Sequence, residues 1–100
     1  MNKYKEYLEK AHENYSNSSI EELCDFYKTS KEHLKNLKEL KVSDYNFSIV
    51  NERDKECAVI FPNYKNRDKI IDLMIEAVEQ DINEVRALIY EILEDGELFD

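Results

Sequence analysis

The chain has one glycine and one proline in 100 residues, and this scarcity limits how it can fold. Flexible linkers, low-complexity segments and collagen-like repeats all need many of these residues. We therefore expect an ordered chain that forms a single domain over residues 1–100, a length typical of single domains. Because the two residues stand at Pro62 and Gly96, neither of them interrupts the first 61 residues, which leaves room for long elements.

Two helices are predicted in the first 41 residues. In the segment 2–15, apolar side chains recur at steps of four, three and four, which places them on one stripe of a helix. A second helix is predicted over about 19–41, because Ser19 followed by Glu22 is the pattern of a capping box. Asparagine and serine between the two segments favour a short loop, so the two helices are predicted to form an antiparallel helical hairpin.

The apolar pattern changes from helical to alternating after Val42. Residues 45–49 place apolar side chains on one side of a strand, residues 57–61 alternate again, and a polar turn over 51–55 separates them. This pattern predicts a β-hairpin over about 44–61. A lone hairpin is marginally stable in water, so we expect the three helices to pack around it. One strand edge is then left free as a docking site for a partner.

A broad apolar face over about 66–95 predicts a third helix, and Gly96 is well placed to end it. Asp81 falls inside this apolar face. Either Asp81 and Glu84 cap a new helix after a break, or the helix is continuous and Asp81 lies at a frayed or partner-facing position; we favour a break or kink. The predicted fold class is therefore α+β: a helical hairpin, a two-stranded antiparallel β-hairpin, then a long or kinked C-terminal helix.

The sequence contains no pattern typical of an enzyme, neither a nucleophile elbow nor a phosphate-binding glycine loop. Glu9 and His12 have the one-turn spacing of di-iron ligands, but the second pair and the further glutamates that such a site needs are missing. We therefore expect a protein that is not an enzyme, with no catalytic, metal-binding or cofactor-binding residue. Cys24 and Cys57 lack metal-ligand spacing and are expected to be reduced thiols packed as small apolar residues.

The beginning of the chain does not lead into the apolar stretch of a signal peptide, and no apolar run approaches the roughly 20 residues of a membrane span. A cytoplasmic protein is the expectation that follows. For a phage-encoded protein, this would be the cytoplasm of the host cell.

Charge is unevenly distributed along the chain, which has 23 acidic and 14 basic side chains and a formal net charge of -9. Residues 1–43 and 44–69 each sum to zero, so the whole excess lies in the last 31 residues. Direct binding of nucleic acid needs clustered lysine and arginine and is not expected. The acidic residues predicted to bind a partner from one helical face are Asp72, Glu76, Glu79, Glu84, Glu91, Glu94 and Asp95.

Two interpretations of that acidic face remain open, a solvated surface and a surface that binds a basic protein. From Asp72 to Asp95 a helix advances roughly 36 Å, which gives about one net charge per 5 Å against one per about 1.7 Å in duplex DNA. Imitation of nucleic acid by this face alone is therefore partial. Complementary charge would still speed the encounter with a basic partner.

The leading functional hypothesis is a small acidic, non-enzymatic inhibitor or regulator of a basic nucleic-acid-handling protein. Phage anti-defence proteins, including inhibitors of CRISPR nucleases, are often small, acidic and free of enzymatic motifs. The chain shares that character without a matching motif. The alternative is a helical scaffold or adaptor that acts as a homodimer, because the apolar face of the last helix is broader than one small domain needs to cover.

Overall fold

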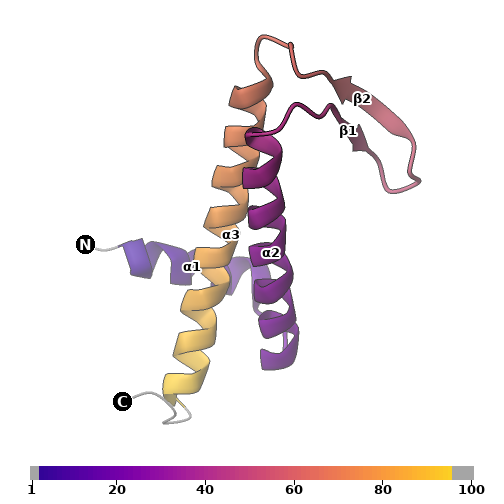
Figure 1. The fold of residues 1–100 in the computed structure, drawn as a ribbon. Helices are drawn as coiled ribbons and strands as arrows, with labels where there is room; N and C mark the ends of the chain where they lie inside the picture. The colour runs from indigo at the N-terminus through magenta and orange to yellow at the C-terminus, as the bar shows by residue number, and fades with distance from the viewer. Residues whose placement is uncertain (1–2, 96–100) are drawn as a thin grey trace.

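The computed structural model describes the backbone of residues 3–95 and the side chains of residues 3–93 (Figure 1). Its elements follow the predicted order and confirm the α+β class. They are α1 (Lys3–Tyr15), α2 (Ile20–Lys41), β1 (Phe47–Val50), β2 (Glu56–Ile60) and α3 (Arg67–Asp95). The predicted end of the last helix at Gly96 lies outside the described residues.

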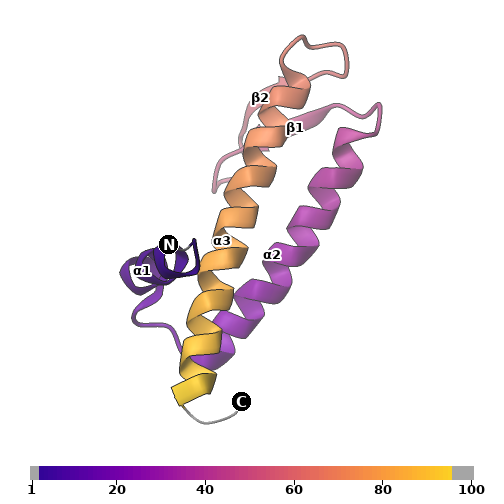
Figure 2. The same ribbon diagram turned by 90° about the vertical axis from the view of Figure 1, so that its left-hand side faces the viewer.

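Helix α3 lies at the centre of the molecule, between the two other helices. Helix α2 runs antiparallel along one side of α3, while α1 crosses the other side at a steep angle (Figures 1 and 2). The predicted antiparallel packing of the first two helices is therefore wrong, since both pack on α3 instead. The reason is the breadth of the apolar face of α3, which offers one contact surface to α2 and a second to α1.

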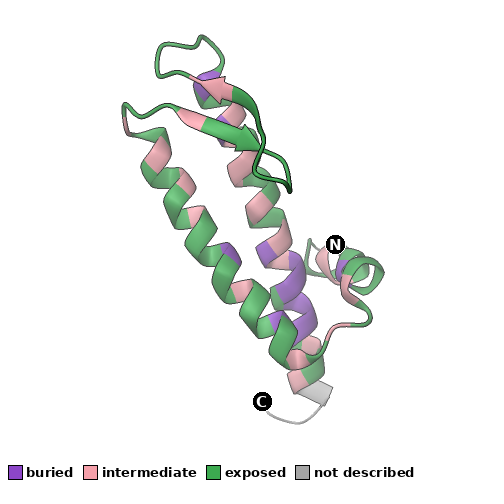
Figure 3. Ribbon diagram, turned by 90° about the vertical axis from the view of Figure 1, so that its right-hand side faces the viewer, coloured by how far each residue is buried: buried purple, intermediate pink, exposed green. Residues whose placement is uncertain are grey.

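The hydrophobic core lies at one end of the helix pair, where α2 begins and α3 ends. It is made of Ala11, Leu23, Val85, Leu88 and Ile89. All five are buried, and the buried parts of the ribbon in Figure 3 gather at this level of α3. The opposite half of the helix pair, toward the hairpin, is mostly exposed, with only Arg67 and Ile71 buried among residues 31–41 and 67–80, because α1 does not reach it.

The start of α2 has the capping box that the sequence predicts. The hydroxyl of Ser19 accepts a hydrogen bond from the backbone N–H of Glu22 at 3.1 Å, and the Glu22 carboxylate accepts from the backbone N–H of Ser19 at 2.9 Å. Two backbone donors that a helix start leaves without partners are satisfied in this way.

Helix α3 is continuous over 29 residues, so the favoured break at Asp81 is wrong. Asp81 is only partly exposed and stays within the helix, because Ile82 and Val85 beside it are buried. Continuous packing of these neighbours outweighs the preference of aspartate for a helix start.

The hairpin projects from the end of the helix pair that lies away from the core (Figures 1 and 3). Antiparallel pairing joins Phe47 to Ile60 and Ile49 to Ala58, and Asp54 in the turn has a φ of 61°. The prediction that helices pack around the hairpin is wrong, since most strand residues are exposed. The extended shape gives a radius of gyration of 16.5 Å, above the roughly 13 Å of a compact chain of this length.

Arg67, the first residue of α3, connects the three elements that meet at the hairpin end. Its side chain is 6% exposed. The guanidinium donates hydrogen bonds to the carbonyl oxygens of Leu40, Ser43 and Tyr45, at 2.9, 3.1 and 3.2 Å. Leu40 lies in the last turn of α2, and the other two lie in the segment leading to β1. The arginine therefore ties the end of α2 and the hairpin entry to the start of α3.

Candidate binding surfaces

The seven acidic residues predicted to form one binding face lie in different environments. Asp72 is half-exposed and forms an ion pair with Lys41 of α2, with 2.6 Å between the Lys41 Nζ and a carboxylate oxygen. A hydrogen bond to this carboxylate raises the pKa of Lys41 above its ordinary value, and the negative charge of Asp72 acts in the same direction. Part of the charge of Asp72 is thus balanced within the protein.

Glu84 is buried and 4% exposed. Its carboxylate accepts hydrogen bonds from the side-chain amides of Asn14 at 3.2 Å and Gln80 at 2.7 Å. A carboxylate held in this way by α1 and α3 connects two helices and is not available to a partner.

A small group of titratable side chains surrounds Glu84. Burial raises the pKa of Asp81, and the negative charge of Glu84 raises it further. Burial also raises the pKa of the Tyr15 hydroxyl, with smaller contributions from Asp81 and Glu84. These side chains lie where α1 meets α3, which makes this a polar contact between helices.

The remaining acidic residues of the predicted face differ again in exposure. Glu91 lies 2.8 Å from Nε2 of His12 on α1. Glu76 and Glu79 are exposed, and Glu79 lines a surface groove together with Lys31 and Arg86. The side chains of Glu94 and Asp95 lie outside the described residues. Of the described five, Glu76 and Glu79 therefore remain the most accessible.

Folding gathers an excess of negative charge in one half of the described molecule. Residues 28–80 hold ten basic and ten acidic side chains, so the whole formal charge of -9 belongs to residues 1–27 and 81–100. The described parts of these segments, 3–27 and 81–93, pack together in the half of the helix pair where α2 begins, with α1 crossing near its middle (Figure 1). We call them the acidic end; they hold nine acidic and four basic side chains.

The acidic end includes exposed residues that the sequence analysis did not select. Among them are Glu13, Glu21, Glu22 and Asp25. The sequence does indicate them, since residues 11–27 contain no lysine or arginine. The net charge of the segment 1–43 is nevertheless zero, because lysines later in α2 offset these acidic residues. The antiparallel packing of α2 and the crossing of α1 on α3 bring these residues next to the last turns of α3.

A second kind of surface is apolar and lies at the other end. A groove of about 450 Å³ between α2 and α3 is lined mainly by the apolar side chains of Leu37, Leu40, Met74, Ala77 and Val78. In the hairpin, Ile49 and Val50 are 43% and 52% exposed. Contiguous exposed apolar side chains are typical of surfaces that bind other proteins.

The two cysteines are free, and neither is packed in the core. Cys24 and Cys57 are both exposed, which contradicts the expectation that they fill apolar space. Within residues 3–93, no group of three or more potential ligand side chains is arranged to hold a metal ion. No described helix combines the length and apolar character needed to cross a membrane.

Comparison of the chain with protein families, curated proteins and solved structures finds no match. The surfaces described above are therefore the basis of the proposed function.

Proposed function

We propose that this chain is a small acidic, non-enzymatic regulator that acts in the cytoplasm by binding a basic, nucleic-acid-handling protein, as phage anti-defence inhibitors do. The observation that carries the proposal is the excess of nine acidic over four basic side chains at the acidic end, while residues 28–80 sum to zero. A charge distribution of this kind orients the molecule as it approaches a positively charged groove and raises the association rate.

The acidic end replaces the single helical face as the surface we expect a partner to contact first. Glu13 and Asp25 come from different helices, and both are exposed. Glu76 and Glu79 remain the accessible members of the face selected from sequence, beside the lysines of α2. Both surfaces can be tested with charge reversals of the same size.

The test compares two double variants that change the net charge equally. One carries Asp25→Lys and Glu13→Lys at the acidic end, and the other carries Glu76→Lys and Glu79→Lys on the helical face. Glu21 is left unchanged, because a lysine in the first turn of α2 would oppose the helix dipole. The ion pair of Glu13 with Lys10 is long, at 3.9 Å, and exposed, so its loss affects stability little.

Each protein is immobilised and exposed to a bacterial lysate, and the bound proteins are quantified by mass spectrometry. We expect the wild type to retain basic nucleic-acid-binding proteins at about 50 mM salt, and to lose most of them at about 300 mM or when duplex DNA is added. The acidic-end variant should lose them, and the helical-face variant should keep them. Equal retention by all three proteins would contradict the proposal, and selective loss by the helical-face variant would move the binding surface to Glu76 and Glu79.

The second candidate function is a helical scaffold or adaptor that acts as a homodimer. The exposed apolar side chains of the hairpin favour it, because a monomer gains nothing from exposing them.

A further inference from the structure

We propose that the open edge of β1 binds β1 of a second copy of this chain, so that two hairpins form one four-stranded antiparallel sheet across a twofold axis. This inference rests on the homodimer candidate and is independent of the acidic end.

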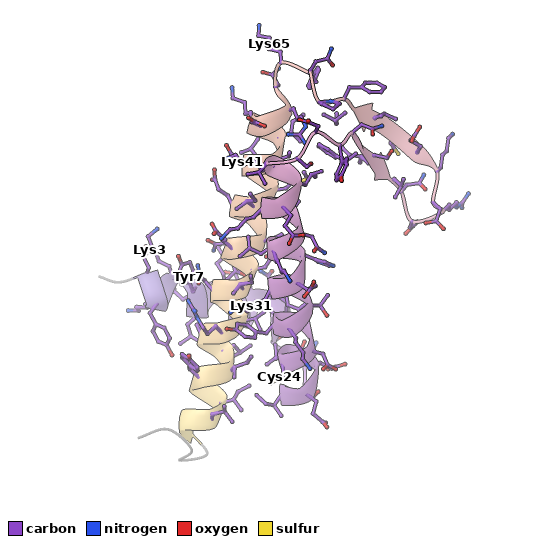
Figure 4. All side chains as sticks on the ribbon, viewed as in Figure 1. Lys3, Tyr7, Cys24, Lys31, Lys41 and Lys65 are labelled. Atoms are coloured by element: carbon purple, nitrogen blue, oxygen red, sulfur yellow. The ribbon has the colours of Figure 1, made fainter. Side chains whose placement is uncertain are left out.

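The hairpin is incomplete as a structural unit. Its sheet has two strands, and residues 48–58 are all exposed. Figure 4 shows its side chains extending away from the helix pair into solvent. Two-stranded sheets need a third strand or a covering helix for independent stability. A second copy that adds two strands would supply what this chain lacks.

The edge of β1 is open for pairing. The backbone N–H of Asn51 donates to the carbonyl of Lys55 across the hairpin at 3.0 Å. Backbone N–H and C=O groups in a strand alternate in direction. Those of Ile49 and Phe47 therefore also point toward β2, whereas those of Ser48 and Val50 point toward the open edge. The register irregularity lies between Ile49 and Val50, so the part of β1 before it is regular.

The sequence of β1 lacks the usual protection of a strand edge. Natural edge strands carry lysine, proline or other charged residues that prevent pairing with another chain. Residues 45–51, Tyr-Asn-Phe-Ser-Ile-Val-Asn, contain none of these. The other strand differs, since β2 begins with Glu56 and Pro62 follows it closely. The edge of β1 is therefore the one suited to pairing.

Charge favours a second copy as the occupant of this edge. The segment 44–66 holds four acidic and three basic side chains, so it is close to neutral. The acidic end lies at the other end of a molecule whose longest extent is 50 Å, while the Debye length at physiological salt is about 8 Å. Two copies that meet at their hairpins therefore keep their like charges apart.

Twofold symmetry restricts the register of the pairing. An axis perpendicular to the sheet places one residue opposite its own copy. With Phe47 on the axis, Tyr45 lies opposite Ile49 of the second copy, and Asn46 lies opposite Ser48. Aromatic and β-branched pairs of this kind stabilise antiparallel sheets.

The neighbouring registers are less favourable because they bring like charges together. With Ser48 on the axis, Asp44 lies opposite Glu52 of the second copy. With Ile49 on the axis, Asp44 lies opposite Asp54 of the second copy. Like charges directly opposite one another destabilise a sheet. The register centred on Phe47 places Asp44 opposite Val50 and avoids this.

The first test compares prolines on the two edges. Ser48→Pro removes an N–H that faces the open edge of β1, and the matched variant Val59→Pro places a proline on the outer edge of β2. In analytical ultracentrifugation at micromolar concentration, we expect a dimer for the wild type and for Val59→Pro, and at least a tenfold weaker association for Ser48→Pro. Circular dichroism checks that the helices are retained. A monomeric wild type, or loss of the dimer only with Val59→Pro, would overturn the proposal.

A second test reads the register directly and does not depend on proline. In a background of Cys24→Ser and Cys57→Ser, Phe47→Cys and Val50→Cys are oxidised separately under mild conditions. With position 47 on the axis, the two cysteines introduced there, one in each copy, lie within the distance of a disulfide. Position 50 lies several residues from position 50 of the other copy. Rapid formation of the covalent dimer by Phe47→Cys alone supports the proposal, and equal rates would contradict it.

Discussion

Arg67 is the residue on which the junction of α2, the hairpin and α3 depends most directly. The last carbonyl groups of a helix have no partner within the helix, and at the end of α2 the Arg67 guanidinium provides one. Its positive charge is also favourable at a helix C-terminus. No sequence pattern identified this role, because the acceptors are backbone carbonyls that lie 22 to 27 residues earlier in the chain.

We expect Arg67→Ala to lower the free energy of unfolding by about 3 kcal/mol, because several carbonyl acceptors lose a charged donor. Arg67→Lys should recover only part of this loss, since an ammonium group cannot match the planar set of donors of arginine. Urea unfolding followed by circular dichroism gives the measurement. Lys69→Ala, at an exposed position two residues along, is the control and should change little. A change below about 0.5 kcal/mol for Arg67→Ala would show that the junction does not depend on this side chain.

Asp81 gives a pH dependence of known sign. Burial and the charge of Glu84 raise its pKa in the folded state above the ordinary value of 3.8. The folded protein then binds the proton more tightly than the unfolded chain, so the contribution of Asp81 to stability decreases as pH rises from about 4 through the raised pKa. We expect Asp81→Asn to raise the melting temperature at pH 7 and to raise it less at pH 4. An equal effect at both values would show that ionisation of Asp81 is not the cause.

At the scale of the elements, the sequence was most informative where a pattern is local. The periodicity of apolar residues and the Ser19–Glu22 capping box located α2 to within a residue, because both features depend on neighbours in the chain. The partner of each helix was not predictable in the same way. Helix α1 has an apolar stripe whose partner its own sequence does not identify, and in the structure it packs on α3.

The uneven packing of the helices leads to a prediction about where stability resides. Leu23 is 1% exposed in the core between α1, α2 and α3, whereas Leu37 lines the open groove at the other end of the same helix. Leu23→Ala should lower the free energy of unfolding by about 3 kcal/mol, and Leu37→Ala by about 1 kcal/mol or less, since a groove wall leaves no closed cavity. Thermal unfolding of the two variants measures the difference. Equal losses would mean that the groove is covered in solution.

At the scale of the whole molecule, the position of the net charge follows from the fold and not from any one element. Running sums along the chain place the excess in the last 31 residues, because they treat neighbours in sequence as neighbours in space. In the structure, the lysines of α2 lie beside the acidic residues of α3, as the pair of Lys41 and Asp72 shows. The lysine-free start of α2 meets the end of α3 instead, and the excess accumulates there.

Crowding of like charges at the acidic end should reduce stability at low salt. The double variant Asp25→Lys, Glu13→Lys lowers this repulsion, so we expect it to unfold at a higher temperature than the wild type in about 10 mM salt, where the Debye length is about 30 Å. The advantage should almost vanish in about 1 M salt, where that length is about 3 Å. Differential scanning calorimetry at both salt concentrations provides the comparison.

The variant Glu76→Lys, Glu79→Lys changes the net charge by the same amount and separates local from global repulsion. Glu79 lies in a groove with Lys31 and Arg86, so a lysine at this position meets positive neighbours. This variant should therefore be less stable than the wild type at low salt. If both double variants became equally more stable, the repulsion would belong to the total charge of -9 and not to its concentration at one end, and the orientation of the molecule toward a basic partner would lose its physical basis.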